Sequence, residues 1–311
     1  MKPLVSIITP TYNHENYIEK CIVSVIKQTY TRWEMIIIDD CSTDKTYEVV
    51  CKYIDDPRIK VVRHHKNWGI NKLADTYNEA LKGAKGQYIA ILEGDDFWPS
   101  HKLEKQVRCF KKNKVVLSYG TCVYTNSYGI PINIHTYNEN ISKLNNKPIG
   151  SILELFCRLN FSIIPVTVMI RIKFLKKIGG FQKSKIYPFT DVPTFLKLCK
   201  NGEFCFKDEI LGYYRKQPTS EWFNYASKTS TMGREELKKS LTEFVNNSFD
   251  SKKHLQRKYK QILNNQNRYL KIKKRNKSMS LLLNYAAFNL VLNPLILIFL
   301  IQYICWKYKK L

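Results

Sequence analysis

The stretch that most constrains this chain is residues 88–98, where an apolar strand runs directly into three carboxylates. Residues 88–92 are apolar and include β-branched side chains, the pattern of a strand buried on both faces. Glu93, Asp95 and Asp96 follow within four positions, a density of charge that a protein core does not accept. We therefore expect them at the carboxyl end of a central strand, where open α/β sheets bind ligands. A solvated acidic turn that only caps the next helix is the alternative.

Carboxylates this close together repel one another, and a divalent cation relieves the repulsion. Mg²⁺ is usually held by one or two carboxylates, with substrate phosphates completing its octahedral shell. Mn²⁺ suits the same hard oxygen ligands. The sequence thus predicts a Mg²⁺ or Mn²⁺ site at this acidic cluster.

The order of strand, polar residues and helix recurs through the first third of the chain. Strands are predicted at 4–9, 34–38, 59–62 and 88–92, and helices at 17–26, 44–54, 70–81 and 102–113. Such alternation gives right-handed βαβ units and a mostly parallel sheet. Because the carboxyl ends of parallel strands meet at one edge, Thr11, Asp39, Asp40, Asp95 and Asp96 are expected to line a single crevice. Neither a Gly-x-Gly-x-x-Gly fingerprint nor a P-loop sequence is present, so those two nucleotide sites are unsupported.

The pattern continues less regularly to about residue 215. Further strands are predicted at 115–118, 121–125, 166–170 and 211–215, and helices at 149–159, 173–178 and 194–200. The polar, Asn-rich residues 128–147 are predicted to form a loop. His14, His64 and His65 are expected to be surface or loop histidines, because no second metal ligand is suitably spaced.

From residue 4 to about residue 220 the chain resembles the glycosyltransferases of family 2, which have the GT-A fold. The motifs that carry the resemblance appear in the family's order: residues 5–13, residues 37–44, Glu93-Gly94-Asp95-Asp96, residues 178–181 and Tyr214-Arg215. They correspond to the opening strand and turn, the nucleotide-base motif, the Asp-x-Asp metal motif and two later landmarks. The expected fold is therefore α/β, a GT-A, Rossmann-like and mostly parallel sheet flanked by helices, in a domain of residues 1–220.

The resemblance implies a nucleotide-sugar site and a metal site. The donor residues it implies are Thr11, Asp39, Asp40, Asp95, Tyr214 and Arg215, and the metal ligands are Asp95, Asp96 and Glu93. A carboxylate from Asp39 or Asp40 would accept the N3–H of uracil, and a dTDP donor offers the same group. Capping of the following helix is the alternative for both residues. Glu93 stands where the family often has Asp. It is still a carboxylate but a longer one, so the resemblance leaves two contacts open for it, the metal or the ribose.

The resemblance also implies a catalytic base. Asp191 matches the residue that takes the proton of the acceptor hydroxyl in an inverting displacement. Family members usually carry an acid just before it, and Thr190 replaces that acid here. Asp191 as only the N-cap of the next helix is the alternative. Gln217 falls where relatives often have His, and no role is assigned to it.

The carboxyl-terminal third is basic and ends in an apolar segment. The chain has 51 basic and 26 acidic residues, a net charge of +25, which favours an anionic partner. Residues 247–279 carry 11 Lys or Arg against one acid, and residues 281–306 carry no charge. We expect a basic helical extension at 221–279 and a membrane-associating segment at 280–311. The apolar run forms a transmembrane helix, two half-helices in one leaflet around Asn293-Pro294, or a buried soluble helix pair.

The sequence therefore predicts a glycosyltransferase at the cytoplasmic face of the cell membrane, peripheral or anchored through its C-terminal segment. It would move a sugar from a UDP-sugar or dTDP-sugar to a glycan or lipid-linked glycan in cell-surface polysaccharide synthesis, against an anionic membrane surface. A catalytically inactive nucleotide-sugar-binding or membrane scaffold protein is the alternative. No nucleic-acid partner is expected, because no recognisable readout module is present. The nine cysteines are an odd, scattered set without a Cys-x-x-Cys pair, which favours reduced thiols in a cytosolic compartment.

Overall fold

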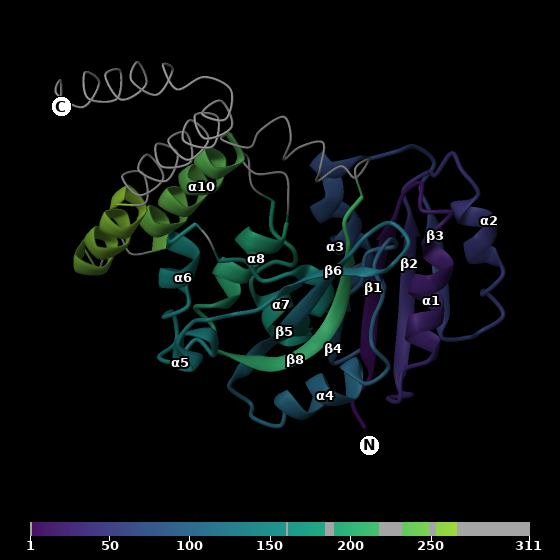
Figure 1. Ribbon diagram of the computed structural model, residues 1–311, viewed down its shortest axis with the longest axis horizontal. Coiled ribbons are helices and arrows are strands. Elements are labelled where there is room, and N and C mark those ends of the chain that lie inside the picture. Colours follow the sequence, from purple (N-terminus) through teal and green to yellow (C-terminus); the bar gives the residue numbers. More distant parts are fainter. Residues whose placement is uncertain (1, 160, 184–189, 218–231, 249–252, 266–311) are drawn as a thin grey trace, which may run out of the picture. The chain divides into compact units, whose positions relative to one another are not determined.

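The computed structural model describes the chain except residues 1, 160, 184–189, 218–231, 249–252 and 266–311 (Figure 1). The chain forms two compact units, Met1–Gln256 and Arg257–Leu311. Of the second unit the structure describes residues 257–265, which are helical. The predicted membrane-associating segment 280–311 and much of the predicted basic extension lie outside the described residues.

A single mixed sheet forms the centre of the first unit. The strands described are β1 (Val5–Thr11), β2 (Trp33–Asp39), β3 (Ile59–Arg63), β4 (Tyr88–Ile91), β5 (Val115–Thr125), β6 (Pro131–His135), β7 (Met169–Arg171) and β8 (Glu203–Arg215). Their order is β3-β2-β1-β4-β7-β5-β6, with β8 paired to β5. The first four strands run parallel. β7 is antiparallel to β4 and β5, β6 is antiparallel to β5, and β8 is parallel to β5.

Helices cover both faces of the parallel half (Figure 1). The helices described are α1 (Ile18–Ile26), α2 (Thr46–Cys51), η1 (Ile70–Lys72), α3 (Leu73–Gly83), α4 (Lys102–Cys109), α5 (Ile141–Leu144), α6 (Leu153–Cys157), η2 (Pro165–Thr167), α7 (Ile172–Lys177), α8 (Asp191–Leu198) and α10 (Met232–Ser248). Because successive side chains of a strand alternate between faces, Ile7 joins Ile22 of α1 in one core, whereas Ile36 packs against Gly83 of α3. Every residue of β1, β2 and β4 is buried, as the apolar runs predicted.

The predicted α/β fold is confirmed, and the main deviations from it lie between residues 115 and 215. The predicted loop at 128–147 was wrong in part, since it contains β6 and α5. β6 is exposed along most of its length and so lacks the apolar signal of a buried strand. The two strands predicted at 115–118 and 121–125 are the single strand β5, and β8 begins eight residues before the predicted start. Among the described residues, no helix has both the length and the apolar character needed to span a bilayer.

Candidate active site

The carboxyl ends of β1, β2 and β4 meet, as the predicted crevice requires. Thr11 is the register partner of Asp39, and the Asp40 N–H donates to the Thr11 carbonyl at 2.9 Å. On the other side, the Gly94 N–H donates to the Pro10 carbonyl at 3.0 Å. A Cβ at Gly94 would lie only 2.7 Å from Thr11 Cβ, so the absence of a side chain permits this approach. The backbone therefore places the two acidic motifs on opposite sides of Thr11.

Glu93, Asp95 and Asp96 form one cluster, in which ligand oxygens of all three carboxylates lie within 4.8 Å of one another. Among the described residues, each carboxylate accepts a hydrogen bond from a different part of the chain. The Tyr77 hydroxyl of α3 donates to Glu93 Oε1 at 2.8 Å, and the Arg215 backbone N–H of β8 donates to Asp96 Oδ1 at 2.8 Å. Gln217 Nε2 donates to Asp95 Oδ2 at 3.0 Å. The cluster is thus held from both halves of the sheet.

The proton affinities of the cluster show that negative charge is poorly compensated there. Burial, followed by the charge of Asp95, raises the pKa of Glu93 to about 7, although the Tyr77 hydroxyl opposes the shift. Burial, followed by the charges of Asp95 and Glu93, raises the pKa of Asp96 well above its ordinary value. A hard divalent cation stabilises such a set of oxygens, and Mg²⁺ and Mn²⁺ both fit the donor chemistry. The residues present therefore fit the predicted metal.

Asp191 is the first residue of α8, and Thr190 occupies the N-cap position. Asp191 Oδ1 is buried and accepts no hydrogen bond from any residue that the structure describes. Burial raises the pKa of Asp191 to about 6, against the opposing effect of the backbone N–H groups of Val192 and Asp191. Its charge in turn raises the pKa of Glu93 and of Tyr77, so the carboxylate lies near the acidic cluster. Thr190, which stands where relatives carry an acid, donates its hydroxyl to the Gln182 carbonyl at 2.9 Å.

The two acids after β2 have different surroundings. Asp39 is fully buried, and its Oδ1 accepts hydrogen bonds from the backbone and hydroxyl of Ser42. Asp39 Oδ2 lies 3.1 Å from Arg63 Nε as an ion pair, but no described donor reaches it with hydrogen-bond geometry.

Asp40 instead holds the loop after β3. Its Oδ1 accepts from the Trp68 N–H at 2.8 Å and lies 2.6 Å from His64 Nδ1, and its Oδ2 accepts from the Gly69 N–H at 2.9 Å. Gly69 has a positive φ of 66°, which a glycine adopts without strain. Both oxygens of Asp40 therefore have partners within the protein.

Arg215 and Tyr214 reach the cluster from the end of β8. The Arg215 guanidinium donates from Nε to the Asp95 carbonyl at 2.7 Å and from Nη1 to the Ser127 carbonyl at 2.5 Å. Its Nη2 is buried and donates to no described residue. Burial, followed by the charges of Asp96 and Asp95, raises the pKa of Tyr214 well above its ordinary value. Both predicted donor-site residues thus lie beside the acidic cluster.

Sequence reasoning missed Tyr77, Gln217 and His64. Tyr77 lies on the apolar face of α3 and shows only the periodicity of a core residue. Gln217 had a weak signal, since it departs from the family's His, yet it contacts Asp95 directly. His64, which we predicted to be a surface or loop histidine, follows β3 but is buried between Asp40 and Glu79. No local sequence pattern reveals these partners, because they are distant in the chain.

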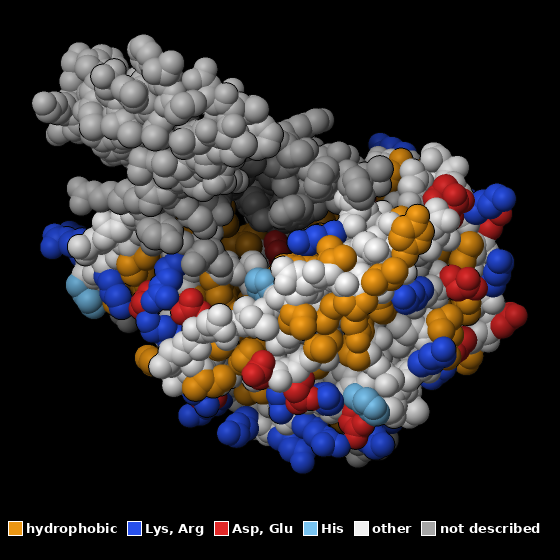
Figure 2. Space-filling view, viewed as in Figure 1, with side chains coloured by type: hydrophobic (Ala, Val, Ile, Leu, Met, Phe, Trp, Pro, Cys, Tyr) orange, Lys and Arg blue, Asp and Glu red, His pale blue; other side chains and the backbone are white. Residues whose placement is uncertain are grey.

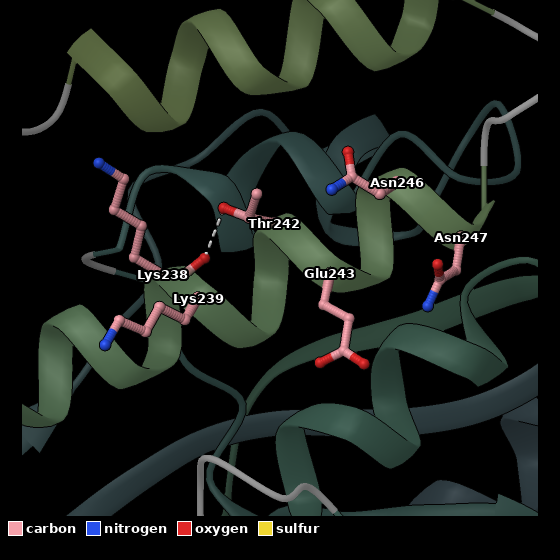
Figure 3. Close-up of a pocket in the computed structure, with 6 residues that line it drawn as sticks. All are labelled: Lys238, Lys239, Thr242, Glu243, Asn246 and Asn247. Atoms are coloured by element: carbon pink, nitrogen blue, oxygen red, sulfur yellow. Dashed lines mark hydrogen bonds between the residues drawn. The ribbon is translucent and has the colours of Figure 1, made fainter.

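A separate hollow of about 450 Å³ lies along α10 (Figure 3). It is lined by Lys238, Lys239, Thr242, Glu243, Asn246 and Asn247. The Thr242 hydroxyl donates to the Lys238 carbonyl within the helix at 2.8 Å. None of the predicted site residues lines it, so it is distinct from the candidate active site.

Comparison with known proteins identifies the family. Residues 6–179, more than half of the chain, match the sequence model described as Glycosyl transferase family 2. The chain belongs to glycosyl transferase family 2. This confirms the resemblance inferred from the motifs, and it makes the chain a glycosyltransferase.

Two bacterial glycosyltransferases are among the relatives of this family 2 glycosyltransferase. The chain is 35% identical over 223 residues to the putative teichuronic acid biosynthesis glycosyltransferase TuaG of Bacillus subtilis, covering 69% of this chain and 79% of TuaG. It is 42% identical over 127 residues to the UDP-Glc:alpha-D-GlcNAc-diphosphoundecaprenol beta-1,3-glucosyltransferase WfgD of Escherichia coli. That match covers 41% of this chain and about half of WfgD, 49%.

Solved structures support the fold of this family 2 glycosyltransferase. Staphylococcus aureus TarS 1–349 in complex with UDP-GlcNAc superposes with a TM-score of 0.63 at 22% identity, over 85% of this chain and 70% of that one. The mannosyltransferase PcManGT of Pyrobaculum calidifontis, in complex with GDP-Man and Mn²⁺, gives a TM-score of 0.57 at 17% identity, over 93% and 81% of the two chains. At these identities the likeness establishes the fold alone.

Proposed function

We propose that this glycosyltransferase moves a sugar from a UDP-sugar or dTDP-sugar to a glycan or lipid-linked glycan in cell-surface polysaccharide synthesis. The observation that carries the proposal is the cluster of Glu93, Asp95 and Asp96, which lies beside the strand ends that carry Thr11 and Asp39. The names of TuaG and WfgD, which concern teichuronic acid and a diphosphoundecaprenol acceptor, support the acceptor class. The UDP-GlcNAc bound by TarS supports a uridine donor.

Asp39, with Thr11 beside it, is the proposed acceptor for the N3–H of the base. Its Oδ2 accepts no hydrogen bond from any described residue, and a buried acceptor of this kind gains from a donor. Asp40 is the weaker candidate of the two predicted acids, because both of its oxygens already hold the loop after β3. We therefore assign the base contact to Asp39 and a positioning role to Asp40.

Asp95 and Asp96, with Glu93, would hold Mg²⁺ or Mn²⁺ against the donor diphosphate. A cation bound there would neutralise charge that develops on the leaving diphosphate. Tyr214 and the unpartnered Nη2 of Arg215 would lie near the same phosphates. Gln217 keeps the Asp95 carboxylate oriented.

Asp191 is the proposed base of an inverting, hexosyltransferase-type single displacement. The acceptor oxygen would form a bond to the anomeric carbon as the bond from that carbon to the diphosphate oxygen breaks. The acceptor proton would pass to Asp191, which has a buried oxygen without a donor and a pKa raised to about 6. The carboxylate is ionised at neutral pH and remains basic enough to accept that proton.

We further propose that the protein works at the cytoplasmic face of the cell membrane. The basic residues 247–279 and the uncharged residues 281–306 support binding to an anionic bilayer, either peripheral or anchored. An acceptor carried on a lipid diphosphate would require such a location.

Calorimetric titration with UDP, dTDP, GDP, CDP and ADP, each with Mn²⁺ and with chelator, tests the donor site. We expect metal-dependent UDP binding that is lost in Asp95→Ala/Asp96→Ala. The matched control Asp208→Ala/Glu209→Ala removes two adjacent carboxylates on β8 and should bind UDP as the wild type does. Absence of nucleotide binding under every condition would refute the proposed function.

A further inference from the structure

The turn before β6 and β6 itself expose an unusual amount of apolar surface. Tyr128 is 83% exposed, and Ile130, Ile132 and Ile134 are 58%, 54% and 52% exposed. Hydrophobic side chains gather in the middle of the face viewed in Figure 2, where Figure 1 places β6. We call residues 126–135 the isoleucine hairpin. Contiguous exposed apolar side chains of this kind mark an interaction surface.

The isoleucine hairpin is also free of charge. No charged residue occurs from residue 115 to residue 138, although 25% of the whole chain is charged. β6 pairs only with β5 among the described strands and ends the strand order there. Edge strands usually carry charged side chains that discourage association, and this one carries none.

Hydrogen bonds connect the isoleucine hairpin to the candidate active site. Its Ser127 carbonyl accepts the hydrogen bond from Arg215 Nη1, and Arg215 Nε binds the Asp95 carbonyl. Gly129 lies against Phe97, which directly follows the acidic cluster. The Arg215 side chain therefore connects the isoleucine hairpin directly to the backbone of Asp95, a proposed metal ligand.

Two lysines flank the isoleucine hairpin. Lys20 Nζ lies beside Gly129 and 3.9 Å from the centroid of the Phe97 ring. Lys216 Nζ lies 4.0 Å from the centroid of the Tyr124 ring on the adjoining strand. Both side chains are exposed, and neither forms an ion pair with a residue in the described ranges. An uncharged apolar strip with flanking cations matches a bilayer surface, whose acyl region is apolar and whose headgroups are anionic.

We propose that the isoleucine hairpin inserts into the headgroup region of an anionic lipid bilayer and positions the donor site there. This inference rests on the proposed function, in which the acceptor is lipid-linked. The phosphates of such an acceptor lie at headgroup depth while its hydrocarbon chain stays in the membrane. The catalytic domain must then bring its site to that depth, and the isoleucine hairpin is an apolar element beside the site. Tyr128 at the turn suits the interface, because its ring is apolar and its hydroxyl is polar.

Hydrogen–deuterium exchange of the full chain, with and without vesicles, tests the proposal locally. The vesicles contain phosphatidylcholine alone or phosphatidylcholine with phosphatidylglycerol. We expect amides of residues 126–135 to be protected by the anionic vesicles. In Ile132→Thr/Ile134→Thr, which keeps β-branched side chains in the strand, we expect that protection to fall about tenfold because less apolar surface is inserted.

The control variant is Ile54→Thr/Ile149→Thr, whose isoleucines are 53% and 52% exposed outside the isoleucine hairpin. It should retain the protection. Vesicles that leave residues 126–135 unprotected, or protection that is equal in the hairpin variant, would overturn the proposal. A third outcome would also overturn it. If residues 126–135 become protected without vesicles as the protein concentration rises, and light scattering shows a doubled mass, then β6 forms an interface with a second copy of the chain.

Metal-dependent UDP binding, measured on the same preparations, separates the two proposals. Wild type that binds UDP but shows no hairpin protection refutes only the membrane inference. Wild type that binds no nucleotide refutes the proposed function. UDP affinity should be unchanged in the hairpin variant, because neither isoleucine belongs to the donor site.

Discussion

Substituting Asp191 by Asn should make the enzyme slower and the folded protein more stable. The folded chain holds the Asp191 proton more tightly than the unfolded chain, because burial raises the pKa from an ordinary value of 3.8 to about 6. The contribution of protonated Asp191 to the stability of the folded state is fully present below about pH 3.8. It is lost as the pH rises through about 6. Wild type therefore carries an unfavourable buried charge at pH 8, and the Asn variant does not.

The magnitude follows from the pKa shift. A shift of about two pH units corresponds to about 3 kcal/mol, and partial contact of the side chain with solvent lowers the expected gain to about 1–3 kcal/mol. Urea unfolding of chelator-treated protein should show this gain at pH 8 and little gain near pH 4. The transfer rate should fall by about 10²–10⁴-fold, the usual contribution of a general base. In wild type, kcat/KM should rise with pH through about 6.

The control is Asp55→Asn, which changes an exposed carboxylate and should alter neither property. A loss of stability at pH 8 in Asp191→Asn would show that the carboxylate has a structural partner, and a gain of equal size at pH 4 would refute the electrostatic argument. A transfer rate within tenfold of wild type would remove Asp191 from the mechanism. Nucleotide binding without any transfer by wild type would favour the alternative of an inactive binding protein.

Substitutions at three further positions test how the site is held in place. Asp40→Ala leaves two backbone N–H groups of the following loop without their acceptor, so urea unfolding should show a loss of about 2–4 kcal/mol. In Gly94→Ala the new Cβ overlaps the Thr11 side chain, so calorimetry should show UDP binding weakened at least about tenfold. An unchanged UDP affinity would contradict the close packing of Gly94 against Thr11. Gln217→Ala removes the hydrogen bond to the Asp95 carboxylate, so titration should show Mn²⁺ affinity lowered by about 10–100-fold. Gln217→Glu, which has no amide donor, should not restore the Mn²⁺ affinity.

The alternation of buried strands and helices predicted the parallel half of the sheet closely. A strand covered on both faces must be apolar along its whole length, so β1, β2 and β4 are visible in the sequence. The order of the motifs also placed Thr11, Asp39 and the acidic cluster at one edge, because parallel strands end on the same side. Those predictions depend on local patterns and on one topological rule.

The other half of the sheet was less visible where its strands face solvent or carry charged residues. β6 is exposed, and the first residues of β8 include Lys207, Asp208 and Glu209. Neither shows a continuous apolar run, so the sequence alone favoured a loop in one case and a shorter strand in the other.

The sequence by itself determined the family, the fold class and the acids that carry the proposed chemistry. Only the tertiary structure separated Asp39 from its neighbour Asp40, and only the tertiary structure brought Tyr77 and Gln217 to the carboxylates of Glu93 and Asp95. The physical reason is distance along the chain. A local pattern records which face of an element is buried, whereas a hydrogen bond between residues 95 and 217 exists only after the two halves of the sheet have packed.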